Sequence, residues 1–117
     1  MPHANVFSSK CPSRDVLVHL SGKWGALIIA ALDSAPHPLR FKDLRASIDG
    51  ISDRMLSHTL GLLERDGILV RNEEDHVTYG LSPLGNDVAQ PLLQLISTVE
   101  NNMGDILQRN EAYDRNH

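Results

Sequence analysis

Apolar residues recur every three or four positions in four segments between Cys11 and Gly67, which is the spacing of a buried helix face. The first segment starts at Cys11-Pro12, where proline suits the first turn of a helix, and ends at Ser21-Gly22. The third is short and stops at an Asp49-Gly50 turn. The apolar positions of the first three segments are Val16, Leu17 and Leu20, then Trp24, Leu27, Ile28, Ala31 and Leu32, then Phe41, Leu44 and Ile48. Three helices are therefore expected before the fourth segment, and the second helix should bury its whole stripe.

The fourth segment predicts a helix with two different faces. Ser52 is a favoured N-cap residue, and Leu56, Leu60 and Leu63 mark the buried side. The opposite side carries only short or polar residues, namely Asp53, Arg54, Ser57, His58 and Gly61. A four-residue turn, Ser47 to Gly50, separates this helix from the third one, so the pair fits a helix-turn-helix, whose second helix enters the DNA major groove. Any amphipathic surface helix also has a polar side, so this face by itself leaves DNA contact and plain solvation both open.

Two stretches of alternating apolar residues follow the fourth helix. Their apolar positions are Ile68 and Val70 in the first stretch and Val77, Tyr79 and Leu81 in the second. Asn72 to His76 form a tight turn between them, so the pair predicts a β-hairpin. A hairpin directly after a candidate recognition helix is the wing of a winged helix. The expected fold class is mainly α with a small β-hairpin, a winged helix-turn-helix.

The end of the chain predicts a long helix that begins at Ser82-Pro83. Its apolar stripe comprises Val88, Leu92, Leu95, Ile96, Val99, Met103, Ile106 and Leu107. Pro91 is expected to kink or interrupt the helix early. The stripe exceeds what three short helices can cover, so we expect it to pack against a second copy of the chain, together with the first helix; folding back on its own domain is the alternative.

The expected organisation has three parts. Residues 1–10 are a flexible N-terminal arm, residues 11–82 a winged helix-turn-helix DNA-binding core, and residues 83–117 a C-terminal dimerisation helix with an acidic tail. A chain of 117 residues with 41% hydrophobic and 22% charged residues is typical of one globular domain. The longest apolar run, Ala26 to Leu32, is too short to span a membrane, and Met1 to Lys10 do not resemble a signal peptide. A single cysteine suits a reducing cytoplasm, which is the expected location.

The net charge of −4 is unevenly distributed along the chain. Residues 1–72 contain nine basic and seven acidic residues, whereas residues 73–117 contain two basic and eight acidic ones. A weakly basic front half suits a protein that presents one face to phosphates, although a merely acidic C-terminal tail explains the same numbers. The acidic balance argues against a protein that holds DNA by bulk charge alone.

Several motifs together resemble the HxlR-type regulators, winged-helix proteins related to the MarR group. They are Cys11-Pro12, Gly22-Lys23-Trp24, Leu39 to Arg45, Gly50 to Leu56, Leu60, Leu63 to Gly67, and Tyr79 to Gly85. The resemblance extends from Cys11 to about Val99. It implies a homodimer that binds a pseudo-palindromic double-stranded DNA operator and often responds to electrophiles or oxidants through the N-terminal cysteine.

The wing departs from the family pattern, because its whole connection is Asn72 to His76 where the family usually has a longer, proline-rich segment. Three consecutive carboxylates, Glu73 to Asp75, would repel backbone phosphates, although Arg71 at the base is placed to reach one. Recognition is therefore expected to rest on the fourth helix. The expected DNA-binding residues are Arg40, Lys42, Arg45, Ser52, Asp53, Arg54, Ser57, His58 and Arg71. Within this set Arg54 is expected to contact a base, and Lys42 and Arg45 to contact phosphates.

Cys11 is the expected redox-sensing residue. It lies at a helix start beside Lys10 and Arg14, where unpaired backbone donors and positive charge favour the thiolate. An inert cysteine near a flexible terminus is the alternative. Because the chain has no second cysteine, any disulfide must join two subunits or a low-molecular-weight thiol. The expected reaction partners are therefore an electrophile, an oxidant or such a thiol.

Other chemistry has little support in the sequence. The six histidines form no i, i+4 pair and have no cysteine at metal-ligand spacing, and there is no Gly-rich phosphate loop or Gly-x-Ser-x-Gly motif. No metal, no cofactor and no enzymatic activity are expected. Two other functions stay open: a regulator controlled by a small ligand at the dimer interface, and a winged-helix adapter that binds protein through its acidic wing.

Overall fold

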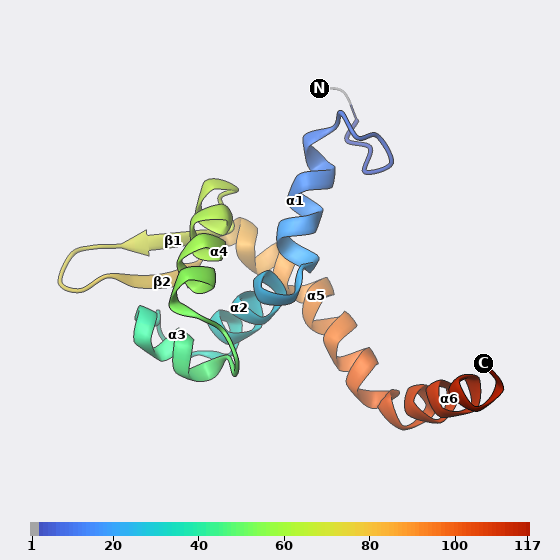
Figure 1. Cartoon of the computed structure of the whole chain (residues 1–117). Helices are drawn as coiled ribbons and strands as arrows, with labels where there is room; N and C mark the ends of the chain where they lie inside the picture. Colours follow the sequence, from blue (N-terminus) through green and yellow to red (C-terminus); the bar gives the residue numbers. More distant parts are fainter. Residues whose placement is uncertain (1–2) are drawn as a thin grey trace.

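The computed structural model describes residues 3–117 and consists of helices with one small hairpin (Figure 1). The elements are α1 (Pro12–Ser21), α2 (Lys23–Ser34), α3 (Phe41–Ser47), α4 (Asp53–Arg65), β1 (Leu69–Asn72), β2 (Thr78–Leu81), α5 (Pro83–Asn101) and α6 (Met103–Asn116). The order of helices, turn and hairpin confirms the expected winged helix-turn-helix class. In the part described, no single helix is long and apolar enough to cross a membrane; α1 and α2 reach that composition only as a pair bent by 66°.

The core lies where α2, α3 and α4 meet the base of the hairpin. Its fully buried side chains are Ile28, Ile29, Leu44, Leu56, Leu63 and Ile68. The buried face of α2 is rotated from the expected stripe, because Ile29 is fully buried whereas Leu27 is 40% exposed. The expectation that the whole stripe is buried was thus wrong at Leu27, since neighbouring elements decide which side of a largely apolar helix is covered.

The turn between α3 and α4 has the geometry expected of a helix-turn-helix. Gly50 has a φ of 85°, a left-handed conformation that glycine adopts without steric cost. Ser52 caps α4, and its Oγ accepts the Met55 backbone N–H at 3.1 Å. Leu44 of α3 and Leu56 of α4 are both fully buried in the core, where each helix packs against α2.

The hairpin pairs β1 and β2 antiparallel, with Arg71 opposite Tyr79. Leu39 adds a one-residue third strand, since Leu39 and Tyr79 exchange backbone hydrogen bonds of 2.9 and 2.7 Å. Only the base of the hairpin packs against helices, while its tip projects from the body (Figure 1). As a result Ile68 is buried but Val70, expected on the same apolar face, is 53% exposed.

The C-terminal part is two helices rather than one. Pro91 was expected to kink or interrupt the helix, and it does not interrupt it, because α5 continues through Pro91 to Asn101 and the break falls at Asn102. The Asn102 side chain donates from Nδ2 to the Thr98 carbonyl at 2.7 Å, and its backbone N–H bonds to the Val99 and Glu100 carbonyls. These local bonds compete with the continuing helix ladder and end it.

Helices α1, α5 and α6 extend away from the core (Figure 1). No residue of α1 or α6 is buried, and the buried residues of α5, Gly85 and Ala89, both lie near its start. Half of the predicted C-terminal stripe is therefore exposed in a single chain: Leu95, Val99, Met103 and Leu107 are 57%, 43%, 37% and 57% exposed.

Candidate nucleic-acid interface

The exposed side of α4 carries the predicted recognition residues. Ser52, Asp53, Arg54, Ser57 and His58 are all solvent-exposed, while Leu56, Leu60 and Leu63 face the core. The Ser52 cap fixes the direction of the first turn, which projects Arg54 outward. A helix presented in this way, with no bulky aliphatic side chain at its centre, can approach a DNA groove closely.

Three of these residues meet around one surface depression of about 390 Å³ at the start of α4. It is lined by Ser52, Arg54, Met55 and His58. Met55, which is absent from the expected DNA-binding residues, is 39% exposed and forms part of the depression. Its position directly after Arg54 was the sequence feature that could have placed Met55 in this depression. The depression combines a guanidinium, an imidazole, a hydroxyl and a thioether, a set suited to reading base edges, including the thymine methyl group.

Arg45 and Asp53 form an ion pair between α3 and α4, with Arg45 Nη1 2.9 Å from Asp53 Oδ1. Both side chains are more than half exposed. The contact neutralises the carboxylate that would otherwise face phosphates from the first turn of α4. Arg45 therefore links α3 to the first turn of α4.

Lys42 and Arg40 lie at the start of α3. Lys42 is exposed, and among residues 3–117 it forms no ion pair, so its ammonium is available to a phosphate. Arg40 is half-buried and acts as the N-cap residue of α3, where its carbonyl accepts the backbone N–H groups of Asp43 and Leu44 at 3.1 Å each. Arg40 is joined through Leu39 to the base of the hairpin.

Arg71 stands apart from the residues on α3 and α4. Its guanidinium is paired with the Glu73 carboxylate at the start of the wing turn. Glu74 and Asp75 follow, and both are exposed. The wing thus presents acidic side chains at its tip and a basic group that is already neutralised at its base.

The Cys11 thiol lies at the N-cap of α1 and is half-buried. Its Sγ is 3.1 Å from Ser13 Oγ and accepts the Asn5 backbone N–H at 3.3 Å. The pKa of this thiol is lowered, mainly by the Ser13 hydroxyl and then by the backbone N–H groups of Asn5 and Ser13, because each donates to the thiolate; desolvation opposes them. Lowering this pKa increases the thiolate population, which is the nucleophilic form.

Arg14, one of the two cationic neighbours expected to favour the thiolate, binds backbone carbonyls instead. The Arg14 guanidinium donates to the carbonyls of Val6 and Phe7 at 3.0 and 2.9 Å, and so fixes the segment before α1. Neither Lys10 nor Arg14 is among the causes of the lowered Cys11 pKa. The expected direction was correct, but hydrogen bonds produce it.

No group of three or more His, Cys, Asp or Glu residues in the described part of the chain is arranged to hold a metal ion. The polar residues that do gather lie on the recognition helix and on its supporting helix, where they face solvent.

A helix-turn-helix with an exposed polar second helix, followed by a β-hairpin, defines a winged helix-turn-helix protein. Residues 19–106 match the family described as HxlR-like helix-turn-helix. The chain belongs to this family and is a transcriptional regulator of the HxlR type. Members of the family are transcriptional regulators, a class that acts by binding DNA.

Similar proteins agree with this assignment. The HTH-type transcriptional regulator YtfH of Escherichia coli (strain K12) is 40% identical over 111 residues, which cover 92% of this chain and 86% of the relative. The solved structure of the transcriptional regulator ytfH from Salmonella typhimurium is 39% identical, with a TM-score of 0.83, and covers 93% of this chain and 99% of that one. The quinone-bound YodB from B. subtilis is 30% identical, with a TM-score of 0.64, and covers 79% of this chain and 98% of that one.

Proposed function

We propose that the protein is a homodimer that binds a pseudo-palindromic DNA operator and changes its affinity when Cys11 reacts. The observation that carries the DNA-binding part is the cluster of Ser52, Arg54 and His58 around one depression on the exposed face of α4. Arg54 has the reach and the donor geometry to contact guanine in the major groove. Lys42 binds phosphate from the supporting helix.

The other candidate residues complete the interface. Ser57 continues the exposed face of α4 one turn after Asp53, and Arg45 holds Asp53 while keeping free donors for a phosphate. Arg40 and Arg71 lie near the base of the wing, at the edge of the interface. The acidic tip makes the wing a weak contributor, so sequence reading rests on α4.

Dimerisation is supported by the exposed apolar side chains of α1, α5 and α6. In addition to the C-terminal stripe, Leu17 and Val18 on α1 are 48% and 61% exposed. Burying these surfaces in a twofold interface would remove them from water and place two copies of α4 on the same side of the dimer. Paired recognition helices suit half-sites about 34 Å apart, one turn of DNA.

The thiol part of the proposal rests on the lowered pKa of Cys11 and on its place at the start of α1. YodB, a structural neighbour, has been solved bound to quinone and after diamide treatment. In this chain the Cys11 thiolate would add to a quinone ring carbon. The hydrogen on that carbon would then move to one ring oxygen and solvent would protonate the other, giving a hydroquinone thioether. Diamide would oxidise Cys11 to a disulfide and would itself be reduced to the hydrazine. The disulfide would join the Cys11 residues of two subunits, or Cys11 and a low-molecular-weight thiol.

The experiment compares operator binding by the wild type and Cys11→Ser, before and after treatment with a quinone and with diamide. Footprinting upstream of the protein's own gene supplies the operator. We expect wild type to lose affinity on treatment and Cys11→Ser to keep it, because this cysteine is the only one in the chain. Steep weakening of operator binding with added salt is expected for both proteins.

Two outcomes would contradict the proposal in different ways. Equal responses by the two proteins would exclude Cys11 as the switch while leaving DNA binding intact. Absence of any salt-dependent DNA affinity would exclude the DNA-binding function and favour a protein-binding adapter.

A further inference from the structure

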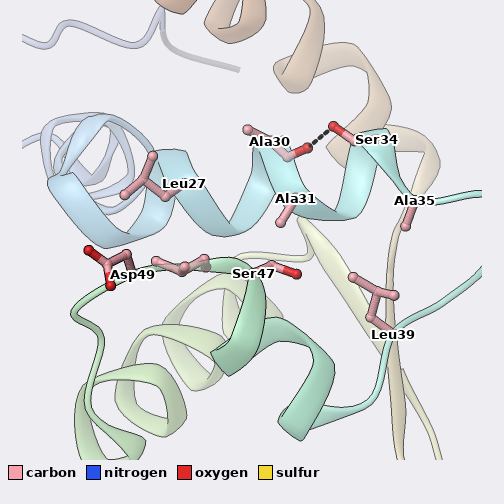
Figure 2. Close-up of a pocket in the computed structure, with 9 residues that line it drawn as sticks. Leu27, Ala30, Ala31, Ser34, Ala35, Leu39, Ser47 and Asp49 are labelled. Atoms are coloured by element: carbon pink, nitrogen blue, oxygen red, sulfur yellow. Dashed lines mark hydrogen bonds between the residues drawn. The ribbon is translucent and has the colours of Figure 1, made fainter.

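A second concave surface lies on the other side of the helix-turn-helix from the Arg54 depression, between α2 and the end of α3. It is a groove of about 620 Å³ lined by Leu27, Ala30, Ala31, Ser34, Ala35, Leu39, Ser47, Ile48 and Asp49. In Figure 2 the side chain of Ala31 on α2 points toward the α3–α4 turn, where Ser47 and Asp49 lie below the helix, and Leu27 lies at the Asp49 end of the groove. The volume lies within the range of small-molecule sites, about 300–1,000 Å³.

The polar side chains of the groove are all acceptors. The Ser34 hydroxyl donates to the Ala30 carbonyl at 2.7 Å, and the Ser47 hydroxyl donates to the Asp43 carbonyl at 2.8 Å. Each serine is thereby left with lone pairs only. The third polar side chain is the Asp49 carboxylate, and within residues 3–117 it takes part in no ion pair. No basic side chain lines the groove.

The end of α2 adds to this negative character. Ser34 is the last residue of this twelve-residue helix and Ala35 its C-cap, and both line the groove. Carbonyl groups at a helix C-terminus carry partial negative charge and favour cations. The groove therefore has apolar walls from leucine, isoleucine and alanine side chains and acceptor side chains only, with Asp49 at the Leu27 end and the C-terminus of α2 at the opposite end (Figure 2).

We propose that this groove binds a small organic cation with an apolar body, such as an arylalkylamine, whose ammonium lies against Asp49 and whose ring lies between Leu27 and Ile48. An anion would meet only acceptor side chains there, and a neutral apolar compound would gain no attraction from the Asp49 carboxylate. The ligand class follows from charge complementarity between a cation and the acceptor side chains of the groove, all of which come from one chain.

The location of the groove connects its occupancy to DNA binding, and this step rests on the proposed function. Ser47, Ile48 and Asp49 belong to the turn that sets α4 relative to α2, and Leu39 is hydrogen-bonded to Tyr79 in the hairpin. A ligand between α2 and the turn would displace α4 relative to α2. We expect saturating amine to lower operator affinity by about fivefold or more, a usual size for allosteric coupling.

The test uses calorimetric titration of the full-length protein with three compounds of similar shape: 2-phenylethylamine, 2-phenylethanol and 3-phenylpropanoate. The cation is expected to bind with one site per chain, the alcohol more weakly and the carboxylate not at all. The single tryptophan gives a second readout, because the Trp24 ring lies 3.9 Å from the Cβ position built at Gly50 in the turn. Ligand binding should change its fluorescence.

Asp49→Asn is the central variant, and Asp33→Asn is its matched control. Asp33 is an exposed carboxylate near the same end of α2, but it lines a separate pocket. Asp49→Asn should lower the affinity for the amine by about fivefold, the upper value for an exposed ion pair, and leave the affinity for the alcohol unchanged. Asp33→Asn should leave both unchanged. Ser47→Leu, at an exposed position on the groove wall, should block the amine and the alcohol alike, with folding verified by thermal melts.

Three outcomes would overturn the ligand proposal. They are equal binding of the three compounds, equal effects of the two aspartate variants, or a Ser47→Leu protein that still binds the amine. Loss of the dimer in Ser47→Leu without any amine binding to wild type would assign the groove to a second copy of the chain instead. Operator binding without ligand, measured on the same samples, tests the proposed function separately.

Discussion

Arg54 and Asp53 are neighbours in the first turn of α4, but their side chains are in different situations. Asp53 is held by Arg45 at 2.9 Å, whereas Arg54 is exposed and forms no ion pair among residues 3–117. Its guanidinium is therefore free to make the bidentate contact that guanine favours.

Arg54→Ala is expected to lower specific operator affinity by about 1–3 kcal/mol, the value of one good base contact. Non-specific affinity should fall much less. Lys42→Ala is the control, because an exposed lysine that contacts a phosphate should lower specific and non-specific binding equally. Titrations with operator and with random DNA measure both. Equal losses for Arg54→Ala would make Arg54 a phosphate contact.

Ser13 is expected to control how Cys11 responds to pH. The Ser13 hydroxyl is the largest cause of the lowered thiol pKa, and Ser13→Ala removes it. The pH at which the alkylation rate of Cys11 reaches half its maximum should then rise, and the rate below that pH should fall. Iodoacetamide labelling followed by mass spectrometry measures this. Ser9→Ala, at an exposed neighbouring position, is the control; the same pH profile in all three proteins would show that the hydrogen bond has no role.

At the scale of elements, α1 is anchored to the rest of the chain by a close helix contact and one polar bridge. His19 Nδ1 lies 2.7 Å from Asp66 Oδ2, which joins α1 to the C-cap of α4. The α1–α2 junction is also tight, because a Cβ built at Gly25 would lie 1.9 Å from the His19 carbonyl oxygen. Through these contacts the helix that carries Cys11 touches the recognition helix directly.

Gly25→Ala should destabilise the protein by about 3 kcal/mol, the upper range for overpacking, because the atom it would displace is backbone. Gly104→Ala is the matched control: no atom lies within 4 Å of its Cβ position, and alanine in a helix is favoured over glycine by about 0.5–1 kcal/mol. Urea unfolding measures both free energies. A Gly25→Ala protein as stable as wild type would show that α1 is free to shift on α2.

The wing is expected to limit DNA affinity. Replacing Glu73, Glu74 and Asp75 by Gln, Gln and Asn removes three negative charges and frees Arg71 from its ion pair. Affinity should rise, and the slope of log affinity against log salt should steepen by about 0.9 for one added phosphate contact. The control neutralises Glu100, Asp105 and Glu111, which lie on α5 and α6. Equal effects of the two triple variants would show that only the net charge of the protein changes the affinity, and not the position of the charges on the wing.

At the scale of the whole molecule, the chain is expanded for its length. Its radius of gyration is 16.6 Å, and its extents are 57 × 40 × 25 Å. A compact domain of this length has a radius of gyration of about 13 Å. The excess comes from α1, α5 and α6, which extend from the core and leave apolar side chains such as Val18, Leu95 and Leu107 exposed to solvent.

Removing residues 90–117 is expected to produce monomers, or aggregates that form through the remaining exposed surface of α1. Operator affinity should fall far more than the loss of local contacts explains, since two linked half-site contacts reinforce each other. Sedimentation analysis and operator titration measure the two effects. Removal of residues 114–117 alone, beyond the apolar stripe, is the control. A soluble truncated monomer with full affinity would contradict the dimer.

Much of the fold was readable from the residues because it depends on local chemistry. Ser52 and Ser82 as N-caps, the turns at Gly50 and Gly67, and the leucine repeat of α4 all involve interactions within a few positions along the chain. In the candidate site, the exposure of Arg54, Ser57 and His58 was predictable for the same reason, because helix periodicity places them on the face opposite the leucines.

What only the tertiary structure decided involves partners far apart in sequence. The strand pairing of Leu39 with Tyr79, the contact of His19 with Asp66 and the groove between α2 and the α3–α4 turn join segments whose spacing has no period. Leu27 and Val70 follow apolar patterns yet remain exposed, because burial depends on what covers a face and not on the face alone. The sequence by itself therefore determined the elements and their polarity, whereas packing determined which polar groups meet and which apolar surfaces are left for a partner.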